Sequence, residues 1–384
     1  MLRDRILEQM KLSVDRGEMA GCSMELLRGG ESLLRLACGC ADLEKRTPVT
    51  YDSIFRLYSQ TKPVTAVAAA MLIERGQLDA GSWVSDFLPG FKNPRVFVSP
   101  TETRPAKRSV TVADLFNMTA GLSYPGGMDA EAAYAKLFSD DQEEMKRGGG
   151  LTTVELANEI GKLPLAFDPG SAYKYSTCAD VLGAVVEIVD GRPFGRFLKE
   201  ELFDPLGMKD TAFYVPKEKQ SRLVTCYKRT DGGLRVFDSL HLCVGDYSRP
   251  PRFESGGAGL VSTLNDYAKF ASMLLGGGSL NSVRYLSPRT VEWLTAPFIP
   301  DFMIDTLWDN QRGYSYAKLM RVCVAPGKSV GLARRGEYGW DGWLGTYFAN
   351  FPEENLTLLF CQNTTDAGTS PLVRKIRNLI LSEM

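Results

Sequence analysis

The feature that most constrains this chain is the placement of strand-like segments at both of its ends, around a long helical middle. Two apolar segments near the N-terminus are separated by the pair Gly29-Gly30, which is a hairpin signal. Two more strand-like segments lie close to the C-terminus. The four segments cover residues 22–27, 32–38, 347–350 and 356–361. Strands so far apart in the chain predict one sheet that is built from both ends.

Helical periodicity supports the same division. Residues Leu2, Ile6, Met10 and Val14 recur at helical spacing, and further helices are predicted at residues 59–76, 264–275 and 372–382. The stretch from about 90 to 260 is rich in loops and mostly helical. We therefore predict an α/β domain split between residues 1–90 and 260–384. A mostly helical domain at 91–259 is inserted between its halves.

Charge and cysteine usage limit the partners and the compartment. The 45 Lys and Arg residues nearly balance the 46 Asp and Glu residues, so no basic patch for nucleic acid or an anionic membrane is expected. There is no run of about 18 apolar residues, and charges interrupt the N-terminal segment, so neither a membrane span nor a signal peptide is predicted. Eight cysteines without a C-x-x-C pair favour free thiols in the cytoplasm.

The single histidine, His241, excludes several kinds of chemistry. A zincin helix needs two histidines, and a histidine-rich metal cluster needs more than one. G-x-S-x-G is absent, and the segment that ends in Gly327-Lys328-Ser329 lacks the first glycine of a phosphate-binding loop. We predict no metal and no cofactor. If the protein is a hydrolase, its base is not expected to be histidine.

A serine and a lysine three residues apart offer another base. If Ser59 opens the predicted helix, Lys62 lies one turn away on the same face. The helix N-terminus favours both an alkoxide on the serine and a neutral lysine. The simpler alternative is that Ser59 is only a helix N-cap. Two more S-x-x-K strings are less suitable: Ser171–Lys174 is predicted to be a turn, and Ser315–Lys318 alternates like a strand.

Several segments together resemble the serine β-lactamase-like superfamily, which includes class C β-lactamases, DD-peptidases and family VIII carboxylesterases. The segment around Ser59 and Lys62 is similar to the nucleophile segment of that superfamily. The other similar segments are residues 41–50, 112–124, 167–177, 256–263 and 340–342. The resemblance implies a β-lactamase/transpeptidase-like α/β fold, with a central antiparallel sheet flanked by helices and a mostly helical inserted domain.

The resemblance also implies roles for individual residues. Ser59 would be the nucleophile, and Lys62 with Tyr175 would act as the base. Tyr173 is a nearby competitor, and a core position is the simpler alternative for Tyr175. Thr177 stands where the superfamily usually has asparagine in Tyr-x-Asn. The backbone N–H groups of Ser59 and Trp343 would form the oxyanion hole.

The third motif departs from the β-lactamase pattern. Trp340-Asp341-Gly342 replaces Lys-Thr-Gly, so an apolar wall stands where a lysine would attract the carboxylate of a β-lactam. Gly342 is expected to let substrate approach a strand edge. We therefore predict a serine hydrolase for small carboxylic esters, with Thr177 and residues 340–342 contacting the substrate. The alternatives are a β-lactamase, a D-amino-acid peptidase or amidase, an acyltransferase, and a non-catalytic binding protein on this fold.

The sequence leaves two questions open. The expected partner is a small acyl substrate, but no pattern predicts the oligomeric state. His241 is expected to have a structural or surface role, with lining of the cleft as the alternative.

Overall fold

The structure is a computed structural model that describes residues 1–300 and 311–384. Its main element is an eight-stranded sheet in which all neighbouring strands are antiparallel, in the order β12-β13-β14-β15-β16-β1-β2-β3. The strands are β1 (Gly21–Arg28), β2 (Glu31–Asp42), β3 (Thr47–Pro48), β12 (Tyr314–Tyr316), β13 (Arg321–Cys323), β14 (Tyr338–Asp341), β15 (Tyr347–Phe351) and β16 (Leu356–Cys361).

Pairing between β1 and β16 joins the two ends of the chain, as the sequence predicts. Ser23 lies opposite Cys361 in this pairing, and Cys22 lies opposite Cys38 on the other side of β1. Every residue of β16 is buried, and so is all of β1 except Arg28. Such continuous burial requires cover on both faces of the sheet, because an open face would show an alternating pattern.

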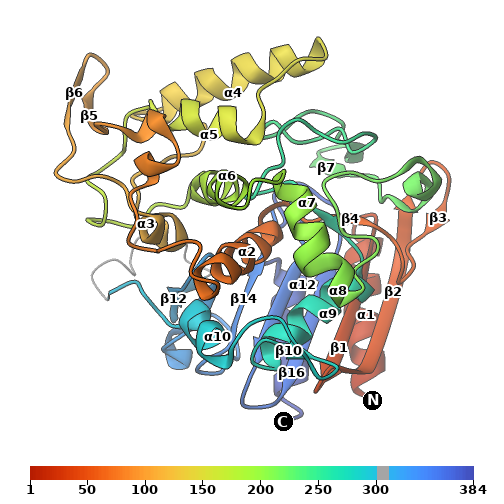
Figure 1. Ribbon diagram of the computed structural model, residues 1–384. Helices are drawn as coiled ribbons and strands as arrows, with labels where there is room; N and C mark the ends of the chain where they lie inside the picture. Colours follow the sequence, from red (N-terminus) through yellow and green to blue (C-terminus); the bar gives the residue numbers. More distant parts are fainter. Residues whose placement is uncertain (301–310) are drawn as a thin grey trace.

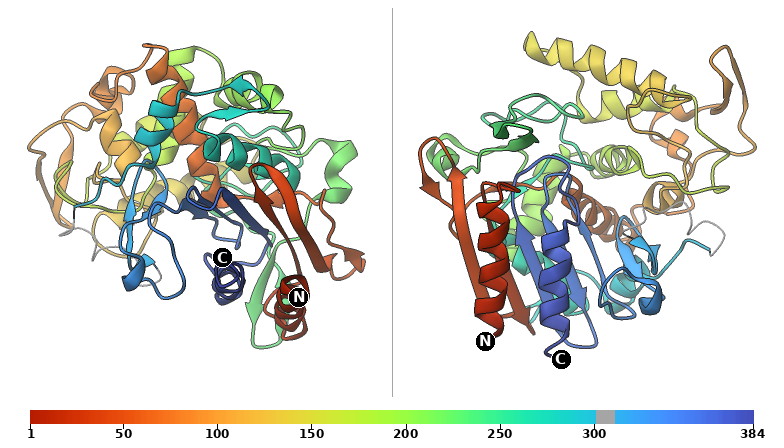
Figure 2. Two further views of the ribbon diagram at one scale, coloured as in Figure 1. Left: turned by 90° about the horizontal axis from the view of Figure 1, so that it is seen from below. Right: turned by 180° about the vertical axis from the view of Figure 1, so that it is seen from behind.

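Helices from distant parts of the chain supply this cover. On one face α1 (Leu2–Asp15) packs beside α12 (Pro371–Leu381), as Figure 2 shows in red and blue. On the other face α9 (Leu264–Leu275) packs on β1, β15 and β16. The predicted helices at both termini and at residues 264–275 are therefore confirmed.

Helix α2 (Lys62–Glu74) lies at the centre of the molecule, between the sheet and the inserted helices (Figure 1). Every residue from Lys62 to Leu72 is buried, which is typical of a helix that is apolar on all sides. It packs on α6 (Cys178–Asp190) and α10 (Pro288–Thr295). The chain leaves the helix at Gly76, whose φ of 69° favours glycine.

The inserted region carries most of the remaining helices. They are α3 (Val112–Asn117), α4 (Glu131–Lys146), α5 (Thr153–Gly161), α7 (Phe194–Leu198), a π-helical turn (Lys199–Phe203) and α8 (Asp204–Leu206). It also holds the hairpins β5 (Arg95–Ser99)–β6 (Glu102–Pro105) and β7 (Tyr227–Thr230)–β8 (Gly233–Val236). The exact limits of a domain at 91–259 stay a prediction.

Short paired segments complete the described fold. They are β4 (Phe55–Arg56) with β9 (Val261–Ser262), and β10 (Ser279–Leu280) with β11 (Val283–Arg284). The pairing of β4 with β9 fixes the strand just before Ser59 against the segment after the Gly256–Gly259 turn. Among the described residues, no helix is both long and apolar enough to cross a bilayer.

Candidate active site

Ser59 and Lys62 lie one above the other at the start of the central helix. A 3₁₀ turn, Tyr58–Thr61, leads directly into α2 at Lys62. Residues three apart eclipse each other in a 3₁₀ turn, because it has three residues per turn. Accordingly, Lys62 Nζ donates to Ser59 Oγ across 3.0 Å. The N-cap positions are Leu57 and Thr61, so the alternative that Ser59 is only an N-cap is wrong.

The backbone just before Ser59 is strained. Tyr58 has a φ of 46°, in the left-handed region that a bulky aromatic residue rarely adopts. Its ring is buried, and its centroid lies 5.1 Å from that of Trp343. Such strain costs about 1–3 kcal/mol and persists only where packing imposes it. Here the packing of Tyr58 fixes the turn that presents Ser59.

Lys62 is completely buried and uses all three of its hydrogen-bond positions. Besides Ser59, it donates to the Tyr124 hydroxyl across 2.9 Å and to the Gly257 carbonyl across 2.8 Å. Burial lowers the pKa of Lys62 to about 7, although the carboxylate of Asp180 acts in the opposite direction. A large fraction of the lysine is therefore neutral near pH 7 and able to accept a proton from Ser59.

Asp180 on α6 holds the glycine-rich turn that contacts Lys62. Its Oδ1 accepts hydrogen bonds from the Ser255 hydroxyl and the Gly257 N–H. Burial raises the pKa of Asp180, whereas Lys62 and these two donors lower it. The next contact, from the Thr65 hydroxyl to the Gly256 carbonyl at 2.7 Å, ties the same turn to α2. The turn is therefore anchored on both sides of the lysine.

Tyr175 lies beside this pair. The ring centroid of Tyr175 is 4.6 Å from Lys62 Nζ, and its hydroxyl accepts a hydrogen bond from Trp340 Nε1 at 3.2 Å. Burial raises the pKa of the phenol, and hydrogen bonds with Ser59 and Trp340 act against this rise. Tyr173 is buried elsewhere, against Tyr316, with ring centroids 5.1 Å apart. Of the two tyrosines, Tyr175 is the one beside Ser59.

Gly342 brings the end of β14 against the nucleophile turn. A Cβ atom on Gly342 would lie 2.1 Å from the Leu57 carbonyl oxygen and 2.4 Å from Thr346 Oγ1. The Thr346 hydroxyl donates to that same carbonyl across 3.0 Å. The expectation that this glycine lets substrate approach the strand edge stays a prediction. Its missing side chain allows two backbone segments to approach each other.

Two backbone donors lie on the segments that approach each other here. Ser59 is in the first turn of its 3₁₀ helix, where N–H groups have no intrahelical acceptor. The N–H of Trp343 donates to no other group within the described residues. The sequence predicts these two N–H groups as the oxyanion hole, and the close approach at Gly342 brings the two segments that carry them together.

Trp340 and Asp341 differ in exposure. Trp340 is 2% exposed, so it forms a wall behind Tyr175 rather than an open surface. Asp341 Oδ1 lies 3.8 Å from the guanidinium of the buried Arg321, and its other oxygen accepts a hydrogen bond from the Thr369 hydroxyl. The direction of Asp341, which the sequence left open, is thus toward Arg321 and Thr369.

The side chain of Thr177 points into the protein and not toward a substrate. Thr177 is fully buried, and its hydroxyl donates to the Ser123 carbonyl across 3.3 Å. The predicted contact with substrate is therefore corrected to a contact with the loop that carries Tyr124. Thr177 directly precedes α6, whose first residues are buried in the core. Its hydroxyl therefore connects the loop to the start of this helix.

His241 packs against the predicted oxyanion segment. The rings of His241 and Trp343 stack with centroids 4.1 Å apart and an interplanar angle of 21°. Burial lowers the pKa of His241 from its ordinary value. The Trp343 indole N–H donates to Asp366 at 2.8 Å, so both rings are fixed at the edge of the site. The structural role that the sequence favours for His241 agrees with this packing.

The other two S-x-x-K strings lie away from this arrangement. The Ser315 hydroxyl is buried and donates to the Ile299 carbonyl at 3.3 Å. Lys318 lies over the ring of Trp293. Lys174 forms an ion pair with Glu131 at 2.8 Å, which occupies its ammonium group. Neither string forms a serine–lysine contact in the described structure.

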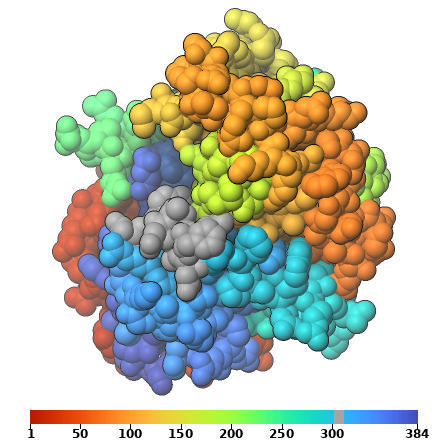
Figure 3. All heavy atoms as spheres, turned by 90° about the vertical axis from the view of Figure 1, so that its left-hand side faces the viewer, coloured from red at the N-terminus to blue at the C-terminus, as the bar shows by residue number. Residues whose placement is uncertain are grey.

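Three groups at the site were not assigned from the sequence: Tyr124, Asp180 and the Gly257 carbonyl. Tyr124 and Gly257 lie in segments that resemble the superfamily, whereas Asp180 follows the segment 167–177. No spacing rule connects any of the three with Lys62. Figure 3 shows a hollow between the green and yellow-green segments, with blue C-terminal atoms at its base. Within the described residues, no three His, Cys, Asp or Glu side chains are grouped as metal ligands.

Comparison with known proteins gives consistent matches along the chain. The sequence pattern of the family described as Beta-lactamase matches residues 3–381. Protein Rv1367c of Mycobacterium tuberculosis is 31% identical over 90% of this chain and 86% of its own length. Esterase EstB of Burkholderia gladioli is 27% identical over 94% of this chain and 91% of its own.

Solved structures agree with the fold. The chain of EstCE1, described as a hydrolase with promiscuous acyltransferase activity, superposes with a TM-score of 0.84 at 24% identity, over 99% of this chain and 98% of its own. Simvastatin synthase (LovD) from Aspergillus terreus gives a TM-score of 0.81 at 20% identity, over 100% of this chain and 98% of its own. At these identities the superpositions concern the fold alone.

Proposed function

The chain belongs to the beta-lactamase family, and from this premise we propose that it is a serine hydrolase that cleaves small carboxylic esters through an acyl-enzyme on Ser59. One observation carries the proposal. The Nζ atom of the fully buried Lys62 lies 3.0 Å from Ser59 Oγ, and burial lowers the pKa of this lysine to about 7. A serine next to a lysine that is partly neutral at pH 7 is an activated nucleophile.

The proposed reaction has two steps. Neutral Lys62 takes the proton of Ser59 while Oγ attacks the ester carbonyl carbon, and the N–H groups of Ser59 and Trp343 stabilise the oxyanion. Tyr175 gives its proton to the leaving alkoxide as the carbon–oxygen bond breaks, and it recovers a proton from Lys62. Water then attacks the acyl carbon, gives its proton to the same pair, and releases the carboxylic acid and Ser59.

Two observations support esters over β-lactams. Trp340 is buried against Tyr175. The carboxylate of Asp341 already forms an ion pair with Arg321 and accepts a hydrogen bond from Thr369. Arg321 itself is 3% exposed, so its charge is not presented to a ligand carboxylate. Among the relatives, esterase EstB is 27% identical to this chain, and a putative D-alanyl-D-alanine carboxypeptidase of Escherichia coli is 24% identical. These relatives leave peptidase, amidase, lactamase and transferase activities as the alternatives.

Substrate comparison tests the proposal. The purified protein and its Ser59→Ala variant are assayed with p-nitrophenyl acetate, p-nitrophenyl butyrate and a chromogenic cephalosporin. We expect ester turnover with a higher kcat/KM than cephalosporin turnover, and loss of both activities in Ser59→Ala. Faster cephalosporin turnover would contradict the ester preference. A wild type without activity on any acyl substrate would favour a non-catalytic binding protein.

We also propose a cytoplasmic location. All eight cysteines are free thiols, including Cys22 and Cys38, whose sulfurs lie only 3.8 Å apart on neighbouring strands. A reducing compartment keeps such a pair as thiols. Localisation of a tagged full-length protein by cell fractionation tests this proposal, and recovery in an extracytoplasmic fraction would contradict it.

A further inference from the structure

A second cavity lies apart from Ser59, between α7–α8 and the segment 208–219. Its volume is about 450 Å³, within the range of small-molecule sites. Its floor is apolar and consists of buried side chains, among them Ile54, Phe203, Met208 and Phe213. A cavity of this size with an apolar floor suits an apolar chain or ring.

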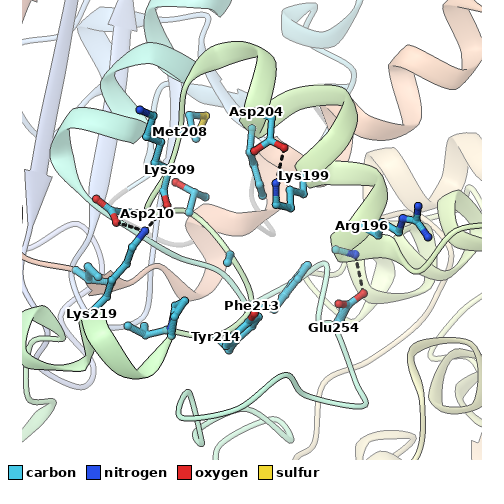
Figure 4. Close-up of a pocket in the computed structure, with 17 residues that line it drawn as sticks. Arg196, Lys199, Asp204, Met208, Lys209, Asp210, Phe213, Tyr214, Lys219 and Glu254 are labelled. Carbon is cyan, nitrogen blue, oxygen red and sulfur yellow. Dashed lines mark hydrogen bonds and ion pairs between the residues drawn. The ribbon is translucent and has the colours of Figure 1, made fainter.

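Charged side chains surround the floor. Lys199 pairs with Asp204, and Lys219 pairs with Asp210 at 2.8 Å. Figure 4 shows these two pairs at different edges of the cavity, with Phe213 between Lys219 and Glu254. Lys209 lines the same cavity, is exposed, and has no acidic partner within the described part of the chain. Lys209 is therefore the one basic side chain of the lining whose charged group has no carboxylate partner in the described residues.

Glu254 is the one acidic group of the lining that has no cation as a partner in the described residues. Its Oε2 accepts a hydrogen bond from the Gly195 N–H at 2.6 Å. Burial raises the pKa of Glu254 to about 7, and the nearby carboxylate of Glu187 acts in the same direction. Other charged groups on the surrounding elements are held in ion pairs. These pairs are Arg196 with Glu200, Lys199 with Asp204, and Lys219 with Asp210, and Arg252 lies 3.9 Å from Glu155.

We propose that this cavity is a second ligand site, and that its ligand is an amphipathic carboxylate whose apolar part lies on the Phe213 floor and whose anionic group meets Lys209. Electrostatics favours an anion over a cation, because the unpaired charge of Lys209 attracts it and Glu254 opposes it only when ionised. The proposal is independent of the ester-hydrolase proposal, since it concerns binding and needs no reaction at Ser59.

The site is also connected with the turn that holds Lys62. Glu254 directly precedes Ser255, whose hydroxyl bonds to Asp180. Ala212, in the cavity wall, exchanges both backbone hydrogen bonds with Val261. A Cβ atom on Gly259 would lie 2.7 Å from the Phe213 ring, so that ring packs directly on the turn. A ligand on the floor thus contacts side chains that support the catalytic turn.

Calorimetric titration tests the proposal with sodium decanoate as the probe. The protein is the Ser59→Ala variant, so that no acyl-enzyme forms, and the titration is made at pH 6 and pH 8. We expect one site. If only the form with neutral Glu254 binds the anion, affinity falls about tenfold from pH 6 to pH 8, because the neutral fraction falls by that factor around a pKa of about 7.

Three further variants in the same background identify the site. Glu254→Gln should bind decanoate with equal affinity at both pH values. Lys209→Gln should bind about threefold more weakly at both, because it removes one exposed charge contact. Ala212→Phe should abolish binding by filling the cavity, with circular dichroism confirming that it folds. If Ala212→Phe does not fold, the Glu254 and Lys209 variants decide.

Several results would overturn the proposal. Decanoate binding that is unchanged in both Glu254→Gln and Lys209→Gln would place the ligand elsewhere, and so would no binding at all at pH 6. Decylammonium is the matched cationic probe. If it binds more tightly than decanoate at pH 8, and loses affinity in Glu254→Gln, the cavity selects cations and the inference is wrong.

Discussion

The indole N–H of Trp340 donates to the hydroxyl of Tyr175 across 3.2 Å, while Lys62 Nζ lies 4.6 Å from the centroid of the Tyr175 ring. Tyr175 is thus held from two sides, by a hydrogen-bond donor at its oxygen and by a cation at its ring face. Burial raises the pKa of this phenol and lowers that of Lys62. The two directions are consistent with the proposed roles, in which Lys62 accepts a proton and Tyr175 donates one.

Replacement of Tyr175 by phenylalanine should remove that proton donor. We expect kcat/KM for p-nitrophenyl butyrate to fall by about 10²–10⁴, the usual contribution of a general acid. Tyr173→Phe is the matched control, because the Tyr173 hydroxyl is buried and has no hydrogen-bond partner in the described residues. It should keep kcat/KM within about twofold. Equal losses in the two variants would contradict the role of Tyr175.

Activity should rise with pH as Lys62 loses its proton. The pKa of Lys62 is about 7, and only its neutral form accepts the serine proton, so kcat/KM should increase through that pH and level off above it. His241 is the one histidine of the chain, and histidine is the side chain whose unperturbed pKa lies close to 7. The inflection should therefore persist in His241→Gln. Its disappearance in that variant would mean that the histidine, and not Lys62, produces it.

The same pKa predicts how stability depends on pH. Lys62 is protonated in the unfolded chain up to about pH 10.4 but is largely neutral above pH 7 when folded. Between these values the unfolded state binds more protons, so its contribution to the free energy of unfolding increases with pH. Relative to Lys62→Met, the wild type should gain about 2 kcal/mol from pH 7.5 to pH 9.

Urea unfolding of both proteins at the two pH values measures this gain. The comparison does not depend on enzymatic activity, and the general effects of pH on the fold are shared by the two proteins. Parallel changes in their free energies of unfolding would show that the pKa of Lys62 is not depressed.

A methyl group at position 342 should displace the oxyanion segment. The Cβ atom of Gly342→Ala would lie 2.1 Å from the Leu57 carbonyl oxygen, so one of the two backbone segments has to move. We expect a loss of about 10²–10³ in kcat, as for the loss of one oxyanion donor, together with a lower Tm. Gly327→Ala is the matched control, because no atom lies within 4 Å of its added Cβ. A Gly342→Ala variant with wild-type kcat would contradict this role.

Local patterns were sufficient to predict most of the fold. The Gly29-Gly30 hairpin, the helix at residues 264–275 and the strand at 356–361 all form where periodicity places them. A sheet built from both ends of the chain was also expected, and the pairing of β1 with β16 is how the structure forms it. The short hairpins inside the helical region were not predicted, because segments such as Arg95–Ser99 have no clear alternation.

The candidate site was predictable only in part. Ser59 and Lys62 are three residues apart, so local geometry alone brings them together. Tyr124 and the Gly257 carbonyl reach Lys62 from 62 and 195 residues away, and no spacing rule relates such distances to contact. The error at Thr177 has a physical cause: sequence similarity suggests a position near the substrate but not the direction of a side chain.

The acyl group on Ser59 is the central claim, and mass spectrometry tests it most directly. The protein is mixed with p-nitrophenyl butyrate, quenched with acid during turnover, digested and analysed for butyrylated peptides. We predict a butyryl group on the peptide that contains Ser59, and none in Ser59→Ala. Butyrylation of another residue, such as Ser171 or Ser315, with ester turnover retained in Ser59→Ala, would contradict the claim.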